Sequence, residues 1–453
     1  MSLPGAPAPL KAAAAAALAL FASGCQFSVD AEQARICRIA LPALNAPGSQ
    51  IVIERAQPGP GGRSVRLDYR VEGLVAPPSR HWAVCRFAAE GLSASKAELV
   101  GVDTDRGPLS GSSVYLLRRF YVDSVEGLMA DPGPGDRVAG LREVPEPVAY
   151  LVQQVLVSLP RTGIYGLLAA AYALLFGLVG RINLAFGELA AVGSAATVAG
   201  AAMVLVSGTS APLLGLGFGL VCALCAGALY SAVGGHFTIA RIRTSSPQPS
   251  LIATVGLSLA LMEYLRVVQS PVTVWLPPIF SEVLPLVRAG TFVVNLTPIS
   301  LLTTGTALAA GLALLWLMRS SAYGRAWRAY ADDARAAELF GVDGRRLLLA
   351  TLALAGAMAG LAGFLIVAQY GGLGFAGGFQ YGLKALIAAV VGGIGSVPGA
   401  LLGGVAVGLF ETLWSSYLPI EARDMALYAA LVVFLVFRPG GFLGIRDPSP
   451  RLV

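Results

Sequence analysis

Lysine is almost absent from this sequence. Only three of the 32 basic residues are lysines, namely Lys11, Lys96 and Lys384, and the rest are arginines. A phosphate-binding P-loop needs a lysine followed by serine or threonine, and each of these lysines is followed by alanine. The chain therefore has no Walker A motif, so any ATP hydrolysis that drives it must come from another subunit.

Charge is scarce as well. Charged residues make up 13% of the 453 residues, whereas a soluble domain carries about 25%. Several apolar runs reach the roughly 20 residues that span a bilayer, so the sequence predicts an integral membrane protein from position 148 onward. The net charge of +6 does not indicate nucleic-acid binding, because the arginines lie mainly in loops between apolar runs, where they set orientation.

Histidine is limited to two residues. His81 has no second histidine and no cluster of cysteines or carboxylates at metal-binding spacing near it, so we expect a surface or packing residue rather than a ligand. No Ser-His-Asp or paired-carboxylate arrangement is visible either. We therefore expect no metal, no cofactor and no catalytic residue, and the chain is not predicted to be an enzyme.

Residues 1–25 have the features of a secretory signal. Lys11 gives a positive start, 12–22 forms an apolar core that is short for a membrane span, and small residues precede Cys25. Small residues before a cysteine are typical of a bacterial lipobox, so Cys25 is a candidate for lipidation. An ordinary signal and an uncleaved anchor are the alternatives, and each places the following segment outside the cytoplasm.

Residues 26–147 are richer in charge, proline and glycine. Their alternating runs predict a small, all-β extracytoplasmic domain; the runs are 50–55, 65–71, 82–87 and 114–122. Cys37 and Cys85 are expected to form a disulfide in an oxidising periplasm, with two buried free thiols as the alternative.

Residues 148–445 predict an all-α polytopic membrane unit. Nine apolar runs follow one another: 150–179, 190–207, 212–233, 251–268, 298–318, 347–368, 381–394, 398–414 and 425–437. They correspond to about eight to nine transmembrane helices, since 381–414 is broken by glycines and reads as two spans or as a re-entrant pair. The sequence shows no inverted repeat.

Basic loops set the predicted orientation, because they stay in the cytoplasm. The loop 319–346 holds six arginines, Arg241 and Arg243 lie in an earlier loop, and Arg438 follows the last run. Counting runs from these loops places residue 150 on the periplasmic side and the C-terminus in the cytoplasm, as the signal sequence also requires.

A few polar residues inside or beside the apolar runs are candidates for translocation or gating. Asn183 and Glu188 begin the second run, where Glu188 either gates or is simply solvated. Lys384 either lines the pathway or snorkels to the interface. Gln380 flanks a glycine-rich outer loop and can face a delivered substrate.

The segment 324–346 is polar, charged and helix-forming, and it lies between two long apolar runs. An ordered amphipathic loop of this length in a membrane protein favours a docking surface for a soluble partner on the cytoplasmic side. A separate ATPase is the partner that this reading predicts.

Five sequence stretches, in this order and spacing, resemble the permease family of branched-chain amino acid ABC importers, the LivH type. They are GLVGRINLAFGEL at 177–189, ARIRTSSPQPSLIATVGLSL at 240–259, GRAWRAYADDARAAELFGVDGRR at 324–346, GLKALIAAVVGGIGSVPGALLGG at 382–404 and FRPGGFLG at 437–444. The resemblance covers 148–445.

The resemblance implies import of a small amino-acid-like substrate through the inner membrane. It also implies a second permease subunit, two ABC ATPase subunits and a periplasmic substrate-binding protein as partners, besides membrane lipid. By the same resemblance 324–344 is the ATPase-coupling segment, with the candidate residues Gly324, Arg325, Arg328, Asp332, Ala336, Glu338, Leu339 and Gly341. The charged ones are expected to make polar contacts, and Ala336 and Leu339 to form the packing face.

Two features depart from the family pattern. Phe186 occupies a position where members commonly have histidine, so any hydrogen-bonding role of that histidine is absent. The exported domain 26–147 is an addition, which we expect to modulate docking of the binding protein; unchanged uptake after its deletion would count against this. The alternatives to the importer are a stand-alone secondary transporter and a membrane-anchored sensor that uses the exported domain.

Overall fold

The computed structural model describes residues 29–46, 49–59, 63–72, 78–89, 97–122, 131–133, 141–206, 212–240, 247–269, 276, 284–289 and 292–444. The predicted signal, Cys25, Arg241 and Arg243 lie outside the described residues. The chain divides into two compact units, Met1–Glu143 and Val144–Val453.

The N-terminal unit contains the predicted antiparallel sheet. Its strands pair in sequence order and are β1 (Gln50–Pro58), β2 (Ser64–Glu72), β3 (Ser79–Phe87), β4 (Leu99–Thr104) and β5 (Gly107–Pro108). Alternation places Leu67, Tyr69 and Cys85 on a buried face. On the other face Arg66 lies over the Trp82 ring. The first three alternating runs therefore predicted strands correctly.

Two helices accompany the sheet, and the alternating pattern did not predict them. Helix α2 (Ala31–Leu44) begins at the N-cap Asp30 and packs on the buried face, where Cys37 forms a disulfide with Cys85. The run 114–122, predicted as a strand, is helical: α3 (Gly111–Leu117) continues into the π-helical turn η2 (Arg118–Val122). Ser110 caps α3 through its hydroxyl, a helix-start signal that outweighs the alternation.

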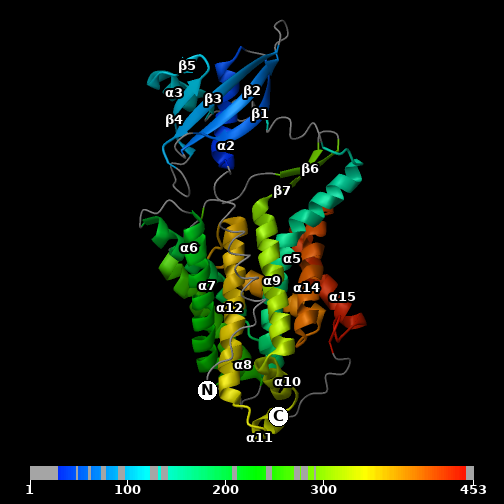
Figure 1. The fold of residues 1–453 in the computed structure, drawn as a ribbon. Helices are drawn as coiled ribbons and strands as arrows, with labels where there is room; N and C mark the ends of the chain where they lie inside the picture. The colour runs from blue at the N-terminus through cyan, green and yellow to red at the C-terminus, as the bar shows by residue number, and fades with distance from the viewer. Residues whose placement is uncertain are drawn as a thin grey trace. The chain divides into compact units, whose positions relative to one another are not determined.

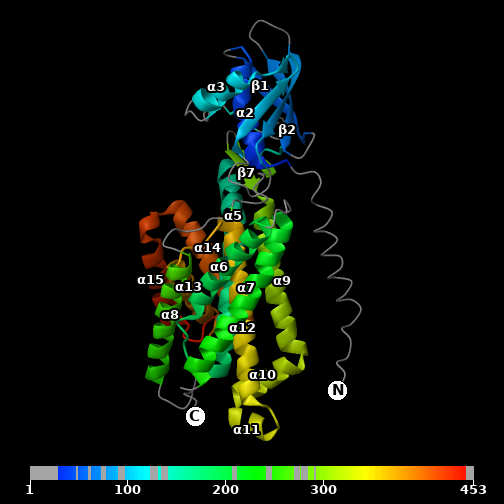
Figure 2. The same cartoon turned by 90° about the vertical axis from the view of Figure 1, so that its left-hand side faces the viewer.

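The second unit is a bundle of helices (Figures 1 and 2). Its elements are α5 (Glu146–Val179), α6 (Phe186–Val206), α7 (Pro212–Gly235), η4 (His236–Ala240), α8 (Pro247–Gln269), β6 (Leu284–Ala289), β7 (Phe292–Leu296), α9 (Pro298–Ser320), α10 (Ala322–Asp332), α11 (Ala334–Leu339), α12 (Gly344–Tyr370), α13 (Gly377–Gly392), α14 (Val397–Tyr417), η5 (Ile420–Ala422) and α15 (Arg423–Phe437). Within the described ranges, seven helices are long and apolar enough to cross a membrane. The two shorter ones, α13 and α15, account for the remaining apolar runs.

Helices α5 and α12 form the centre of this unit, and small residues let other helices approach them closely. Helix α14 runs antiparallel along α5, with Gly404 against Gly166 and Gly408 against Thr162. Helix α7 packs along α12 in the same way, with Gly227 against Gly356. Such small-residue contacts replace the hydrophobic effect as the source of helix association in lipid.

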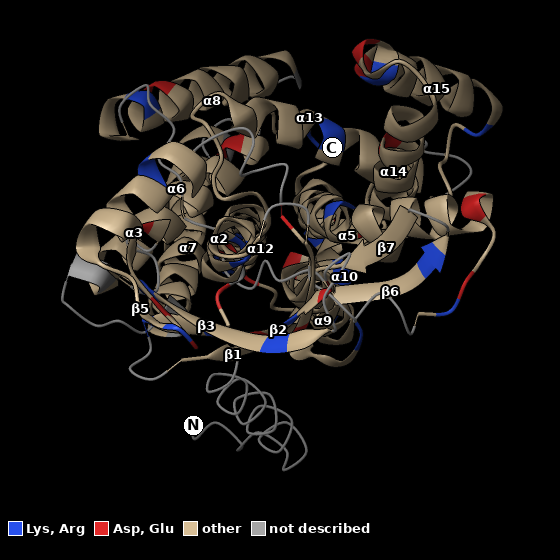
Figure 3. Ribbon diagram, turned by 90° about the horizontal axis from the view of Figure 1, so that it is seen from above, with Lys and Arg blue, Asp and Glu red and all other residues tan. Residues whose placement is uncertain are grey.

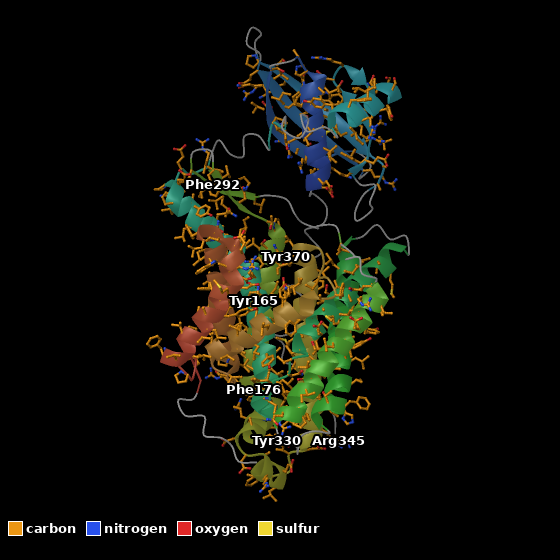
Figure 4. The ribbon with its side chains drawn as sticks, turned by 180° about the vertical axis from the view of Figure 1, so that it is seen from behind. Tyr165, Phe176, Phe292, Tyr330, Arg345 and Tyr370 are labelled. Carbon is orange, nitrogen blue, oxygen red and sulfur yellow. A yellow bond between two sulfur atoms is a disulfide. The ribbon has the colours of Figure 1, made fainter. Side chains whose placement is uncertain are left out.

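Helices α5–α8 and α12–α15 repeat one arrangement in opposite directions. Each set begins with a central helix that ends at a left-handed glycine, Gly180 (φ 67°) or Gly371 (φ 85°), and the next helix begins the same number of residues later. Along α5 the chain descends towards Phe176 in Figure 4, whereas along α12 it ascends towards Tyr370. The sequence shows no inverted repeat, because this likeness lies in the helix ends and directions and not in similar residues.

Candidate functional site

The GRINLAFGEL stretch forms a break between α5 and α6 inside the bundle. Gly180 closes α5 in the left-handed conformation, and the Asn183 N–H then donates to the Tyr172 hydroxyl at 3.0 Å. The Asn183 side chain accepts from the Ala185 N–H at 3.1 Å, which holds the turn that starts α6. Phe186 is fully buried and its ring meets Tyr172 edge-on. An aromatic contact thus occupies the position of the histidine that this chain lacks.

The first turns of α6 and α13 cross in contact with each other. A Cβ added to Gly187 would clash with the Gly378 carbonyl and the Gly382 backbone, so only glycine permits this approach. Glu188, the next residue, is 0% exposed. Its Oε1 accepts from Ser258 of α8 at 3.4 Å, and its Oε2 lies against Gly378 without a hydrogen-bond partner. The alternative that Glu188 is simply solvated is therefore excluded.

A cluster of ion pairs lies between α13, α14 and the start of α15. Lys384 is 7% and Glu411 2% exposed, and Lys384 Nζ lies 2.5 Å from Glu411 Oε1. Asp424 is 3.3 Å from the same Nζ, and Arg423 is 3.2 Å from Glu411. Tyr165 of α5 donates to the second Glu411 oxygen at 2.7 Å. Lys384 is thus buried and paired and does not snorkel to the interface.

The partners of Lys384 are not among the candidates predicted from the sequence. Glu411 is an acid in the middle of the run 398–414, and charged residues in such runs are expected to find partners. That signal was available for Glu411, whereas Arg423 and Asp424 looked like ordinary loop charges. Gln380 lies on α13 with an exposed side chain and takes no part in the cluster.

The coupling candidates lie on α10 and α11, a short helical pair at the end of the bundle opposite the hairpin β6–β7 (Figure 1). Trp327, which is buried, donates its indole N–H to the Leu174 carbonyl of α5 at 3.1 Å and lies against Gly177. Tyr323 pairs with Thr351 of α12 at 2.8 Å. The pair is thereby attached to both central helices.

Glycine and arginine attach α10 to the end of α9. Gly324 lies so close to the Met318 backbone that a side chain there would clash. Arg328 donates to the Met318 carbonyl, and Arg325 donates to the Ser320 carbonyl at 3.2 Å. These guanidinium groups neutralise the negative end of the α9 dipole. Arg325 and Arg328 therefore have roles within the chain, in addition to any contact with a partner.

The turn from α10 to α12 carries the remaining candidates. Asp332 is exposed, and Asp333 caps α11. Glu338 accepts from the Tyr330 hydroxyl at 3.1 Å. Gly341, in the left-handed conformation at φ 88°, ends the turn.

Two large apolar side chains stand at the tip of this pair. Leu339 and Phe340 are each 90% exposed, while Ala336 is half-buried. Phe340 was not among the sequence candidates, although it adjoins Leu339. Adjacent exposed apolar residues among charged ones mark an interaction site when they lie outside the membrane.

The family of the chain is decided by its match to a family model described as "Branched-chain amino acid transport system / permease component", over residues 155–436. The chain belongs to this family. The permease LivH of Escherichia coli K12 is 32% identical over 299 residues, which are 66% of this chain and 97% of that protein. BraD of Pseudomonas aeruginosa is 29% identical, over 66% of this chain and 98% of that protein. No solved structure matches the chain.

More distant transport proteins match shorter parts. The fructose import permease FrcC of Rhizobium meliloti is 34% identical over 105 residues, 22% of this chain and 29% of that protein.

Family membership and the seven apolar helices make the chain a multi-pass permease of the inner membrane. In a view along the bundle, with charged residues coloured, most of the ribbon belongs to uncharged residues (Figure 3).

Proposed function

We propose that this chain is the membrane permease subunit of an ATP-driven importer for branched-chain or related amino acids. The observation that carries the proposal is the exposed pair Leu339 and Phe340 at the tip of an otherwise anchored element. In a chain without a Walker A motif, this tip suits a groove on a separate ATPase subunit. The substrate class follows from the names of LivH and BraD, to which the chain is similar.

The segment 324–346 transmits motion in this proposal. Closure of the ATPases on ATP moves the tip, and the Trp327–Leu174 and Tyr323–Thr351 contacts carry the displacement to α5 and α12. Buried side chains resist compression, so a shift of α10 is passed on to its neighbours. The remaining candidates of the segment position the tip: Gly324, Arg325, Arg328, Asp332, Ala336, Glu338 and Gly341.

The proposed importer also implies an orientation of the chain in the membrane and a set of partners. Residues 319–346 and the C-terminus face the cytoplasm and 26–147 the periplasm, because the loops rich in arginine stay inside. A second permease subunit, two ATPase subunits and a periplasmic binding protein complete the importer, and the N-terminal unit modulates docking of the binding protein. Asn183, Glu188, Lys384 and Gln380 serve translocation or gating.

A stand-alone secondary transporter is the second candidate, because an inverted repeat with broken helices is also typical of that class. It requires neither an ATPase nor the exposed tip. The two candidates differ in which proteins co-purify with the chain from the membrane.

The test is affinity purification from native membranes in mild detergent, with mass spectrometry of the associated proteins. We expect P-loop ATPases and a second permease to co-purify with the unmodified chain. For the double variant Leu339→Ala/Phe340→Ala, the amount of co-purified ATPase is expected to fall at least about tenfold. Truncating two central anchors of an interface commonly costs about 2 kcal/mol or more.

Leu312→Ala is the matched control, because Leu312 is an exposed leucine on α9, away from the tip. It should retain the ATPases. Purification of the unmodified chain alone contradicts the importer and favours the secondary transporter.

A further inference from the structure

Glu188 presents a carboxyl oxygen without a hydrogen-bond partner at the crossing of the two broken helices. Among the described residues, it alone has a buried carboxylate oxygen without a hydrogen-bond partner. A charged group inside a membrane protein is expensive and is usually paired. The Oε2 atom of Glu188 therefore lacks a partner that the described residues of the chain do not supply.

The surroundings of this oxygen define the kind of partner. It lies against Gly378, in the first turn of α13, whose N-cap position has no side-chain hydrogen bond. The N-terminus of a helix carries about half a positive charge, which orients the carboxylate without neutralising it. Lys384, on the same helix, pairs with Glu411 and Asp424. The missing partner fits a cationic hydrogen-bond donor, which the described residues of the chain do not supply.

Helix α8 borders this position with a polar face. Ser250, Thr254 and Ser258 are buried, and they repeat at the four-residue spacing that places them on one side of a helix. Ser258 reaches Glu188. Most of the membrane-spanning part of α8 is exposed within this chain. A polar stripe therefore leads along α8 to the Glu188 carboxylate.

We propose that Glu188 binds the ammonium group of the transported amino acid as the substrate passes the crossing of α6 and α13. The proposal rests on the proposed function and adds a selecting residue within the permease itself. The first turn of α13 offers backbone N–H groups beside it that suit the substrate carboxylate. In this proposal the substrate passes only when α6 and α13 separate, because Gly187, Gly378 and Gly382 are in contact.

The experiment uses the complete complex in proteoliposomes with its binding protein, and measures amino acid uptake and ATP hydrolysis together. Glu188→Gln keeps the size of the side chain and removes its charge. We expect it to assemble and to hydrolyse ATP near the wild-type rate, while uptake per ATP hydrolysed falls at least about tenfold. Glu263→Gln, which removes an exposed carboxylate from the same helix α8, should stay within about twofold of wild type.

The outcomes separate the two proposals. Wild-type vesicles without ATP-driven uptake overturn the proposed function, and this inference with it. If Glu188→Gln matches the wild-type uptake, the inference alone is overturned, because position 188 then works without a charge. If Glu188→Gln does not assemble, the comparison moves to Glu188→Asp and Glu188→Asn. The charged variant must then transport at least about fivefold faster per ATP than the neutral one, and equal rates overturn the inference.

Discussion

Glu411 is the residue on which the charges of the membrane unit converge. It accepts hydrogen bonds from Lys384 and Tyr165 and forms an ion pair with Arg423, so both of its oxygens have partners. Burying one member of such a set is tolerable only while the others are present, since desolvation of an unpaired charge is costly. The cluster therefore joins α5, α13, α14 and α15 at a single carboxylate.

Removal of either buried partner is predicted to destabilise the chain. Glu411→Leu and Lys384→Met should each lower the free energy of unfolding, by less than the about 3–5 kcal/mol of a buried charge left without any partner. Lys384 keeps Asp424 in the first variant, and Glu411 keeps Arg423 and Tyr165 in the second. The double variant should cost less than the sum of the two. Thermal unfolding of the purified chain in detergent, followed by tryptophan fluorescence, measures this.

The control is Glu263→Gln, which breaks the exposed pair with Arg266 on α8. Its unfolding midpoint should match that of the unmodified chain, because exposed ion pairs contribute little. Strict additivity of the two buried substitutions would contradict the coupling.

The sequence predicted part of this residue-level picture. Lys384 and Glu188 were recognisable as candidate functional residues, because an ionisable residue in an apolar run usually has a function. Their partners were not, since Lys384 meets residues 27 and more positions away in the sequence. The aromatic replacement at Phe186 was visible, but its contact with Tyr172 depends on how α5 and the break fold together.

The two helix breaks are the elements that shape the centre of the bundle. Each follows a left-handed glycine, and each places the start of a helix next to the other at Gly187, Gly378 and Gly382. The small size of these residues sets how closely α6 and α13 approach.

Gly187→Ala is predicted to disrupt the crossing. Its methyl group would enter the space of the Gly378 carbonyl, so α6 and α13 must shift apart, at a cost of about 1–3 kcal/mol. Uptake should fall together with the unfolding midpoint. Gly305→Ala is the matched control, since it lies on α9 in open space; it should be neutral or slightly stabilising. A wild-type midpoint for Gly187→Ala would contradict the tight crossing.

In the proposed importer the pair α10–α11 separates docking from transmission. Leu339 and Phe340 would dock on the ATPase, whereas Trp327 connects the pair to α5. We predict that Trp327→Phe leaves ATPase co-purification intact and slows uptake by about fivefold, because it removes one hydrogen bond worth about 1 kcal/mol. Uptake and co-purification measured on the same preparation check this. Loss of the ATPase from Trp327→Phe would mean that docking and transmission are one function.

Local patterns predicted elements unevenly. Three strands followed from alternation, since one face of each is buried. The run 114–122 alternates too, but Ser110 starts a helix there. The N-cap Asp30 is a helix-start signal for α2, although the alternating pattern did not predict this helix.

At the scale of the whole molecule, the chain combines a small disulfide-linked unit with a permease bundle. The family model matches within the second unit only. Length and hydropathy sufficed to predict the membrane helices, and the arrangement of α5–α8 against α12–α15 did not follow from them. An inverted repeat preserves packing geometry while the residues diverge, so it appears only in three dimensions.

The proposed orientation gives a prediction for single added cysteines. Leu339→Cys should react with a membrane-impermeant maleimide only in inside-out vesicles, because the tip faces the cytoplasm. Tyr115→Cys, at an exposed position of the N-terminal unit, should react only from the periplasmic side. The unmodified chain controls for Cys222 and Cys225. Labelling of both positions from the same side would contradict the orientation.

The most direct test of the central claim is uptake of a branched-chain amino acid into proteoliposomes that contain this chain with its co-purified partners and binding protein. We predict uptake that requires ATP on the side of the membrane where the ATPases lie. This uptake should continue after ion gradients are dissipated. Uptake that ignores ATP and stops when the gradients collapse would contradict the importer and identify a secondary transporter.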